Sequence, residues 1–183
     1  MEELSIANIT LENREALIDE LMQQYGQDIL QLVYSYVNNQ TIAEDLTQDI
    51  FVKCYQSLST YKGKSSLKTW LWRIAINHSK DYIKSWYNRR VLPTAYEALC
   101  ESEGTESVEQ TVIQQDEDEQ LSAAVMDLPV KYREVIYLFY FEELPIKEIA
   151  TILELNANTV KTRMRKGKDI LKKRLEAKSW TND

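Results

Sequence analysis

The amino-acid sequence predicts an all-α fold of two small helical domains joined by an acidic linker. Glycine and proline, which interrupt helices, are scarce, at 4 and 3 of the 183 residues. Apolar residues recur at steps of three and four along several stretches, which is the spacing of amphipathic helices. A run of acidic residues without a core pattern lies between two such groups of stretches. With 44% hydrophobic residues, each group can bury a core of its own.

The N-terminal domain is expected over residues 1–92. Its three expected helices span residues 15–37, 41–58 and 67–88. Thr41 is the expected N-cap of the second helix, because Glu44 follows it in capping-box spacing. Gly63 lies in the loop before the third helix. That helix has apolar residues on more than one face and should therefore be covered on more than one side.

The linker is expected over residues 93–118 and the C-terminal domain over residues 119–183. Pro129 and Pro145 suit the first turns of two helices. The turn 154–157 then leads into a last helix over about 158–178. The apolar positions that should face the core of this helix are Val160, Met164, Gly167, Leu171 and Leu175. Its spacing from the preceding helix, with Ala150 at the crossing and Leu155 in the turn, is typical of a helix-turn-helix.

Several classes of function find little support in the sequence. There is no continuous apolar run long enough to span a membrane, and the N-terminus is acidic where a signal peptide would be basic. We therefore expect a cytoplasmic protein without membrane insertion. Cys54 and Cys100 lack CxxC spacing, and the single His78 completes no zinc site with them. We expect reduced thiols, no metal, no cofactor and no catalytic residues, because no phosphate loop or evident pair of carboxylates occurs either.

The net charge of −7 hides an alternating distribution. Residues 61–90 carry eight bases and one acid, and residues 158–178 carry nine bases and two acids. Acidic segments flank both blocks. Two basic blocks in an acidic chain suit a protein that touches a polyanion at two places. Either block alone could instead be an ordinary solvated helix face.

The basic side of the last helix favours DNA reading over a bare helical hairpin. Lys161, Thr162 and Arg165 lie opposite the apolar stripe. In a helix-turn-helix such positions enter the major groove, where lysine and arginine bond guanine or phosphate oxygens.

Two long stretches resemble a known family. LPIKEIATILELNANTVKTRMRKGKDILKKRL resembles region four of sigma factors, which reads the minus-35 promoter element. TIAEDLTQDIFVKCYQSLSTYKG followed by SSLKTWLWRIAINHSKDYIK resembles region two of the extracytoplasmic function (ECF) group of the sigma-70 family. The likeness runs in the family's order from about residue 15 to residue 178. Departures are Glu154 and Asn158 where glycine is usual, and Lys166 and Lys168 where arginine is frequent.

The resemblance implies a sigma subunit that brings core RNA polymerase to promoters. The implied minus-35 contacts are Asn158, Thr159, Lys161, Thr162, Arg163, Arg165, Lys166 and Lys168. The implied minus-10 contacts are Lys53, Tyr61, Lys62, Ser65, Ser66, Lys68, Arg73 and Asn77. Among these, Lys53, Tyr61 and Asn77 would form a pocket for one flipped base. Trp70 is expected in the core, whereas Trp72 could serve either the core or stacking.

The resemblance also implies protein partners. Glu44, Asp45, Gln48 and Asp49 would contact the clamp helices of the largest polymerase subunit, although a solvated acidic face is the simpler alternative. The C-terminal domain would contact the flap of the second-largest subunit, and an anti-sigma factor would hold the protein inactive. A self-contained helix-turn-helix repressor or activator is the alternative function, which would bind a palindrome without polymerase.

Overall fold

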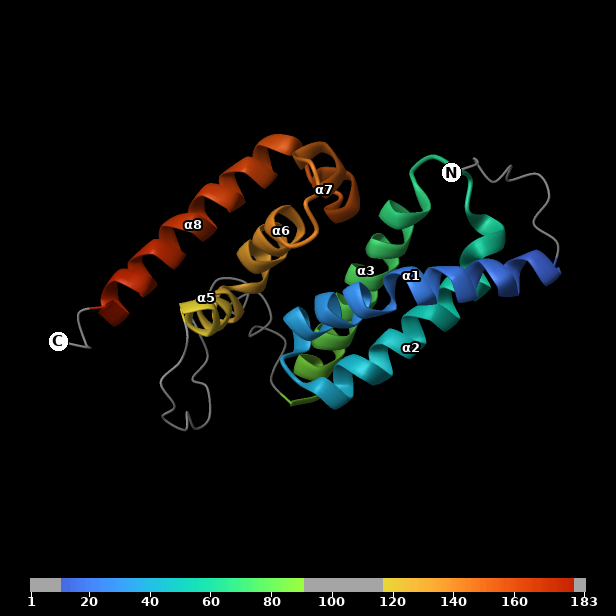
Figure 1. Cartoon of the computed structure of the whole chain (residues 1–183), viewed down its shortest axis with the longest axis horizontal. Helices are drawn as coiled ribbons and strands as arrows, with labels where there is room; N and C mark the ends of the chain where they lie inside the picture. Colours follow the sequence, from blue (N-terminus) through green and yellow to red (C-terminus); the bar gives the residue numbers. More distant parts are fainter. Residues whose placement is uncertain (1–10, 91–116, 180–183) are drawn as a thin grey trace. The chain divides into compact units, whose positions relative to one another are not determined.

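The computed structural model describes residues 11–90 and 117–179, and every regular element in these ranges is helical, which confirms the all-α prediction (Figure 1). The chain divides into two compact units, Met1–Ile83 and Lys84–Asp183. The expected linker, residues 93–118, lies almost entirely outside the described residues. No helix in the described ranges is long and apolar enough to cross a bilayer.

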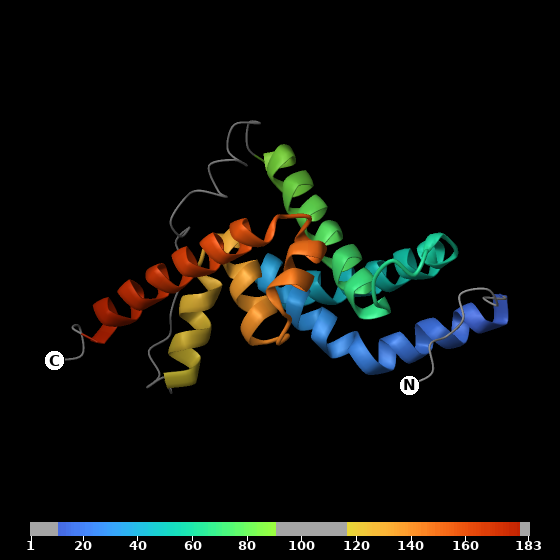
Figure 2. The ribbon, with the colours of Figure 1, turned by 90° about the horizontal axis from the view of Figure 1, so that it is seen from above.

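The first unit contains a helical pair and a third helix that packs across it (Figure 2). Its elements are α1 (Leu11–Val37), α2 (Gln40–Ser57), the 3-10 turn η2 (Leu58–Thr60) and most of α3 (Leu67–Arg90), which continues past Ile83. Asn38 has a φ of 49° just after α1, and the side chain of Asn39 accepts a 3.0 Å hydrogen bond from the backbone N–H of Ile42. Asn39, and not Thr41, is therefore the N-cap of α2, which corrects the capping-box prediction.

The core of the first unit is built from all its helices. Ile29 and Leu32 of α1, Ile50 of α2 and Leu71 of α3 are fully buried. Trp72 is also fully buried, and its ring meets the ring of Tyr25 edge to face at 5.2 Å.

The nearby Trp70 is less buried than Trp72. Trp70, which the sequence places in the core, is only half-buried. It lies one residue before the buried Leu71 and so points to a different side of α3.

Cys54 is a free, buried thiol, and burial raises its pKa to about 12.

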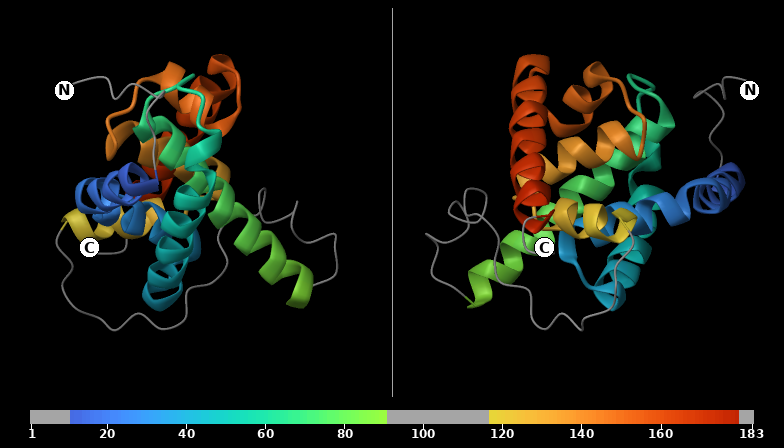
Figure 3. Two further views of the ribbon diagram at one scale, coloured as in Figure 1. Left: turned by 90° about the vertical axis from the view of Figure 1, so that its right-hand side faces the viewer. Right: turned by 60° about the vertical axis from the view of Figure 1, so that its left-hand side comes forward.

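The second unit, in the residues that the structure describes from 117 to 179, is helical (Figure 3). The helices in this range are α5 (Glu117–Met126), α6 (Val130–Tyr140), α7 (Ile146–Leu153) and α8 (Ala157–Ser179). Pro129 and Pro145 each occupy the cap position directly before α6 and α7, next to the first turns expected for them. The long helix α8 packs on the other three. Gly167 permits its close approach to α6, since an added Cβ would lie 3.1 Å from Cγ1 of Ile136.

Candidate nucleic-acid interfaces

The turn between α7 and α8 sets the direction of the last helix. Glu154 ends α7 in the left-handed conformation, with a φ of 55°, and the N–H of Leu155 donates to the carbonyl of Ala150 at 2.9 Å. Asn156 then caps α8, because its Oδ1 accepts the backbone N–H of Thr159 at 2.7 Å. The sequence analysis did not predict this cap, although asparagine is preferred at N-caps and Asn156 lies in the predicted turn.

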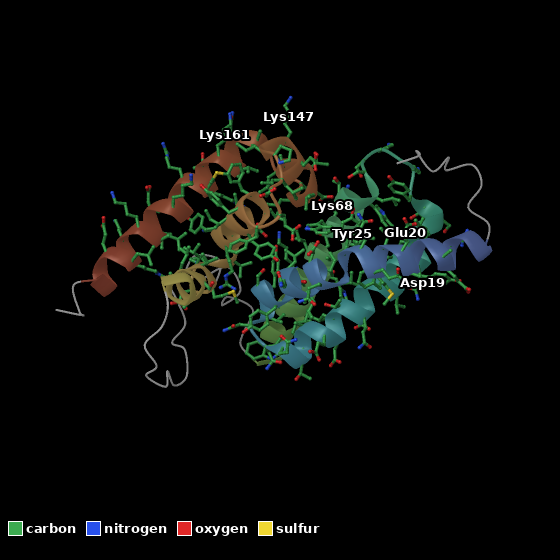
Figure 4. The ribbon with its side chains drawn as sticks, viewed as in Figure 1. Asp19, Glu20, Tyr25, Lys68, Lys147 and Lys161 are labelled. Carbon is green, nitrogen blue, oxygen red and sulfur yellow. The ribbon has the colours of Figure 1, made fainter. Side chains whose placement is uncertain are left out.

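Six of the eight predicted minus-35 residues are exposed on α8. Of the predicted apolar stripe, Val160, Met164 and Gly167 are buried, whereas Leu171 and Leu175 are only half-buried. The exposed predicted residues are Asn158, Lys161, Thr162, Arg165, Lys166 and Lys168. Lys161 points away from the ribbon in Figure 4, as does Lys147 of α7. The helix thus presents cations and short polar side chains together, which can contact both base edges and phosphates.

The other two predicted residues have partners inside the second unit. The hydroxyl of Thr159 donates to Oδ1 of Asn156 at 3.0 Å and so belongs to the cap of α8. Nη1 of Arg163 lies 2.9 Å from Oε1 of Glu134 on α6, and the Glu134 side chain is 2% exposed. Arg163 therefore ties α8 to α6, in a direction different from that of the exposed cations.

Lys168 has an aromatic neighbour. Its Nζ lies 5.2 Å from the centre of the Tyr140 ring, and Tyr140 itself is exposed at the end of α6. A cation over an aromatic face is held without being neutralised, so Lys168 keeps its charge for a contact with an anion.

In the first unit, the structure brings Tyr61 together with Ser65 and Trp70. The Tyr61 hydroxyl donates to the carbonyl of Ser65, and the Tyr61 and Trp70 rings lie 5.4 Å apart. Partial burial raises the pKa of Tyr61, so the phenol stays neutral. Ser66 caps α3, since its Oγ accepts the N–H of Thr69 at 3.1 Å. The two aromatic rings form a surface on which a base can stack.

Lys53 and His78 connect α2 with α3. Nζ of Lys53 donates to Nδ1 of His78 at 2.7 Å, and Nε2 of His78 lies 3.8 Å from Asp49, too far for a hydrogen bond. Burial and the positive charge of Lys53 lower the pKa of His78, while Asp49 and Asp81 act in the opposite direction. Sequence reasoning did not assign His78 to this site, because nothing in its spacing predicts a contact 25 residues away.

Asn77 lies on the same face of α3 as Trp70, two turns further along, or about 10 Å along the axis. Asn77, Lys62 and Arg73 are exposed. Lys68 is half-buried, and its Nζ lies 4.8 Å from the centre of the Trp72 ring, with Tyr25 beyond it (Figure 4). The candidate strand site is therefore an elongated surface, with a stacking end at Tyr61 and an amide further along.

The acidic face of α2 is exposed, as expected. Glu44, Asp45, Gln48 and Asp49 recur in adjacent turns, and all four side chains are exposed. Nε2 of Gln40 donates to Oε1 of Glu44 at 2.7 Å. This face presents carboxylates and an amide to a partner, and it lies on a different helix from the basic residues of α3.

The described residues hold no group of His, Cys, Asp and Glu side chains suited to a metal ion. With its exposed basic helix after a capped turn, the second unit defines a DNA-binding protein of the helix-turn-helix class. Family comparisons extend this assignment to both units. The family described as "Sigma-70 region 2" matches residues 21–90, and "Sigma-70, region 4" matches residues 118–171.

Relatives from known organisms match most of the chain. The "ECF RNA polymerase sigma factor SigW" of Bacillus subtilis (strain 168) is 32% identical over 169 residues, which is 85% of this chain and 87% of the relative. "RNA polymerase sigma factor SigV" of the same organism is 31% identical over 150 residues, covering 82% and 86%. The chain belongs to the ECF group of the sigma-70 family of RNA polymerase sigma factors. It is a transcription initiation factor and not an enzyme.

Two solved structures share the fold. "Structure of CnrH in complex with the cytosolic domain of CnrY" has a TM-score of 0.65 at 20% identity and covers 91% of this chain and 92% of that chain. The "Co-crystal structure of the sigma factor RpoE in complex with the anti-sigma factor NepR from Bartonella quintana" has a TM-score of 0.62 at 21% identity, covering 86% and 96%.

Proposed function

We propose that this sigma factor reads the minus-35 duplex with α8 and opens the minus-10 element with the surface between Tyr61 and Asn77. The observation that carries the proposal is the exposed set of cations and short polar side chains on α8, presented after a capped turn. In the helix-turn-helix class, this face of the second helix enters the major groove. The protein acts in the cytoplasm, and residues 1–92 and 119–183 work as separate domains joined by residues 93–118.

Thr162, Arg165 and Lys166 are the central minus-35 readers. All three are exposed, on the part of the α8 surface that faces away from the buried Val160, Met164 and Gly167. Lys161, Asn158 and Lys168 flank them and contact bases or phosphates at the edges of the groove. Arg163 acts differently from its neighbours, because its guanidinium is paired with Glu134, and it positions α8.

Strand opening uses the first unit. A base extruded from the minus-10 element stacks on the Tyr61 and Trp70 rings, and the exposed Asn77 amide bonds the edge of a base further along α3. Lys62, Arg73 and Lys68 contact the strand's phosphates. Lys53 also contacts the minus-10 strand, through an ammonium group that His78 orients. Ser65 and Ser66 shape the loop through the bonds they make to Tyr61 and Thr69.

The protein partners follow from the same family membership. The α2 face formed by Glu44, Asp45, Gln48 and Asp49 docks on the clamp helices of the largest polymerase subunit, and the second unit docks on the flap of the second-largest subunit. An anti-sigma factor holds the protein inactive. The two fold neighbours are complexes, one with the cytosolic domain of CnrY and one with the anti-sigma factor NepR, which supports this part of the proposal.

The duplex-reading step is tested with core polymerase and promoter fragments. Arg165→Ala should weaken promoter binding by about 1–3 kcal/mol if a base contact is lost. Scrambling the minus-35 element should erase the difference between variant and parent. Lys173→Ala, which removes an exposed charge from the same helix, is the matched control. A defect of Arg165→Ala that persists unchanged on scrambled DNA would contradict base reading.

The strand-opening step is tested separately with Asn77→Ala. Binding to the closed duplex should barely change, while permanganate reactivity of unpaired thymines should appear more slowly. A template with a pre-melted minus-10 bubble should recover part of the lost rate, because base pairing no longer has to be broken. Opening at the parent's rate, with an unaltered base preference, would remove Asn77 from the site.

Polymerase dependence separates this function from a self-contained repressor. A sigma factor should protect promoter DNA only together with core polymerase, whereas a repressor footprints a palindrome alone. Protection of a palindrome by the isolated chain at the same concentration would favour the alternative.

A further inference from the structure

A cleft between α6 and α8 opens beside the residues proposed to read the minus-35 element. Lys131 and Tyr132 of α6 line one side, and Thr162, Arg165, Lys166 and Asp169 of α8 line the other. Its volume is about 750 Å³, which is within the range of clefts that accept ligands of nucleotide size. Lys131 and Tyr132, which line its α6 side, are not among the predicted minus-35 contacts.

The charges in this cleft favour an anion. Arg163 also lines it, but its guanidinium is paired with the buried Glu134 at 2.9 Å, so its charge is largely offset. The other cations, Lys131, Arg165 and Lys166, share the cleft with one carboxylate, that of Asp169. A concave surface with this excess of cations concentrates negative charge, and phosphate is the anion that lysine and arginine bind most readily.

Lys131 is held at the cleft by its neighbour. Its Nζ lies 5.3 Å from the centre of the Tyr132 ring, and both side chains are half-buried. Part of the conformational freedom of the lysine is therefore already lost before any ligand arrives, which lowers the cost of fixing it on a phosphate.

We propose that this cleft seats one backbone phosphate of promoter DNA, with Lys131 as the cation that binds it. The inference rests on the proposed function. If Thr162, Arg165 and Lys166 face the major groove, a sugar-phosphate backbone runs along the edge of that groove, next to α8. Lys131 lies across the cleft from these residues and so faces that backbone. The minus-35 surface then includes α6 as well as the helix-turn-helix.

A phosphate contact predicts a specific salt dependence. Each neutralised phosphate adds about 0.9 to the slope of the logarithm of affinity against the logarithm of salt concentration. With polymerase holoenzyme containing Lys131→Ala, this slope should be shallower by about 0.9. Between about 50 and about 200 mM salt, the variant should lose about three- to fourfold less affinity than the parent. At a given salt concentration, the affinity that Lys131→Ala loses relative to the parent should be equal on promoters with the intact and the scrambled minus-35 sequence, since a phosphate carries no sequence information.

The contacted phosphate can be located directly. Promoters that carry a single uncharged methylphosphonate are bound by parent and variant holoenzymes in turn. At one position flanking the minus-35 element, the methylphosphonate should weaken promoter binding by the parent holoenzyme but not by the Lys131→Ala holoenzyme. Lys131→Arg should behave as the parent, Lys131→Gln should repeat the alanine result, and Lys173→Ala should stay sensitive at that position.

Other outcomes overturn the proposal. An unchanged salt slope, or the absence of any position at which methylphosphonate weakens binding by the parent but not by Lys131→Ala, would exclude the phosphate contact. If inorganic phosphate or a nucleoside triphosphate perturbs the NMR signals of Lys131 and Lys166 in the free chain while DNA binding is insensitive to Lys131, the cleft serves a small anion instead. Failure of the parent holoenzyme to bind promoters at all would count against the proposed function and not against the cleft alone.

Discussion

Arg163 and Glu134 join α8 to α6 through an ion pair in which Nη1 lies 2.9 Å from Oε1, and the carboxylate side is almost completely buried. Arg163→Ala would leave a buried carboxylate without this partner. Such losses cost about 3–5 kcal/mol for fully buried pairs, and because the arginine side chain is 26% exposed we expect about 2 kcal/mol. Hydrogen exchange of α6 and α8 amides should show this loss in the second unit.

The matched control for this prediction is the exposed neighbour Arg165. Arg165→Ala should change the free energy of opening, obtained from the same exchange rates, by less than about 0.5 kcal/mol. The double variant Arg163→Met with Glu134→Leu should regain most of the stability, because no charge is left buried. Equal effects of the two single arginine variants would mean that the ion pair does not stabilise the packing of α8.

His78 should give the first unit a measurable pH dependence. Its pKa in the folded chain lies below the ordinary 6.5, chiefly because of burial and next because of Lys53. Between these two pKa values the unfolded chain binds a proton that the folded chain does not. The contribution is therefore fully present above pH 6.5 and is lost as the pH falls towards the folded pKa. His78→Gln should flatten this part of the stability curve.

The chain has a single histidine, so one imidazole NMR signal reports the titration. Lys53→Ala should move its midpoint upward, because a nearby positive charge is removed. Lys84→Ala, at an exposed position further along α3, should leave it unchanged. A parent midpoint at or above 6.5 would mean that burial and Lys53 do not outweigh the opposing carboxylates of Asp49 and Asp81.

Glu154 has a left-handed backbone at the end of α7, where glycine carries no steric cost. Glu154→Gly should stabilise the second unit by about 0.5–1 kcal/mol, after the greater freedom of glycine in the unfolded chain is counted. Glu148→Gly, inside α7, should instead destabilise by about 1 kcal/mol. Exchange rates of α7 amides measure both, and a loss of stability from Glu154→Gly would show that its side-chain interactions outweigh the backbone strain.

Two helix glycines allow the same substitution to be compared in open and crowded surroundings. A Cβ at Gly26 would meet nothing within 4 Å, so Gly26→Ala should gain nearly the full helix propensity, about 1 kcal/mol. A Cβ at Gly167 would lie 3.1 Å from Ile136, so Gly167→Ala should gain clearly less. Chemical denaturation of both variants tests this difference, and equal gains would mean that α6 yields freely.

Periodicity was sufficient to predict the helices and the buried side of α8 as far as Gly167, because apolar side chains are driven out of water. The stripe was predicted to continue through Leu171 and Leu175, which are only half-buried. Caps were harder, since Asn39 and Thr41 both offer a suitable oxygen and only the backbone at Asn38 decides between them. The prediction that Trp70 lies in the core was wrong, because Trp70 is half-buried and Trp72 is the fully buried ring. Which of two neighbouring rings enters the core depends on the rotation of α3.

The candidate site was predicted as a set of residues, without the partners of their side chains. Arg163 and Arg165 are equivalent in a charge count, yet one is paired with Glu134, which precedes it by 29 residues. Likewise, the contact of Lys53 with His78 links two helices. Pairings between distant positions depend on tertiary packing, and neither helix periodicity nor local charge contains that information. Lys131 was missed because it lies in a segment whose overall charge is acidic.

The buried Cys54 has a consequence for chemical stress. Only the thiolate reacts readily with peroxides or alkylating agents, and with a pKa of about 12 roughly one molecule in 100,000 carries it at neutral pH. Electrophiles that reach the cell would therefore leave α2 unmodified for as long as the first unit stays folded. Modification of Cys54 would then be a signature of unfolding, and in a Cys100→Ser variant, which leaves Cys54 as the single thiol, a fluorescent maleimide could time the opening of this core.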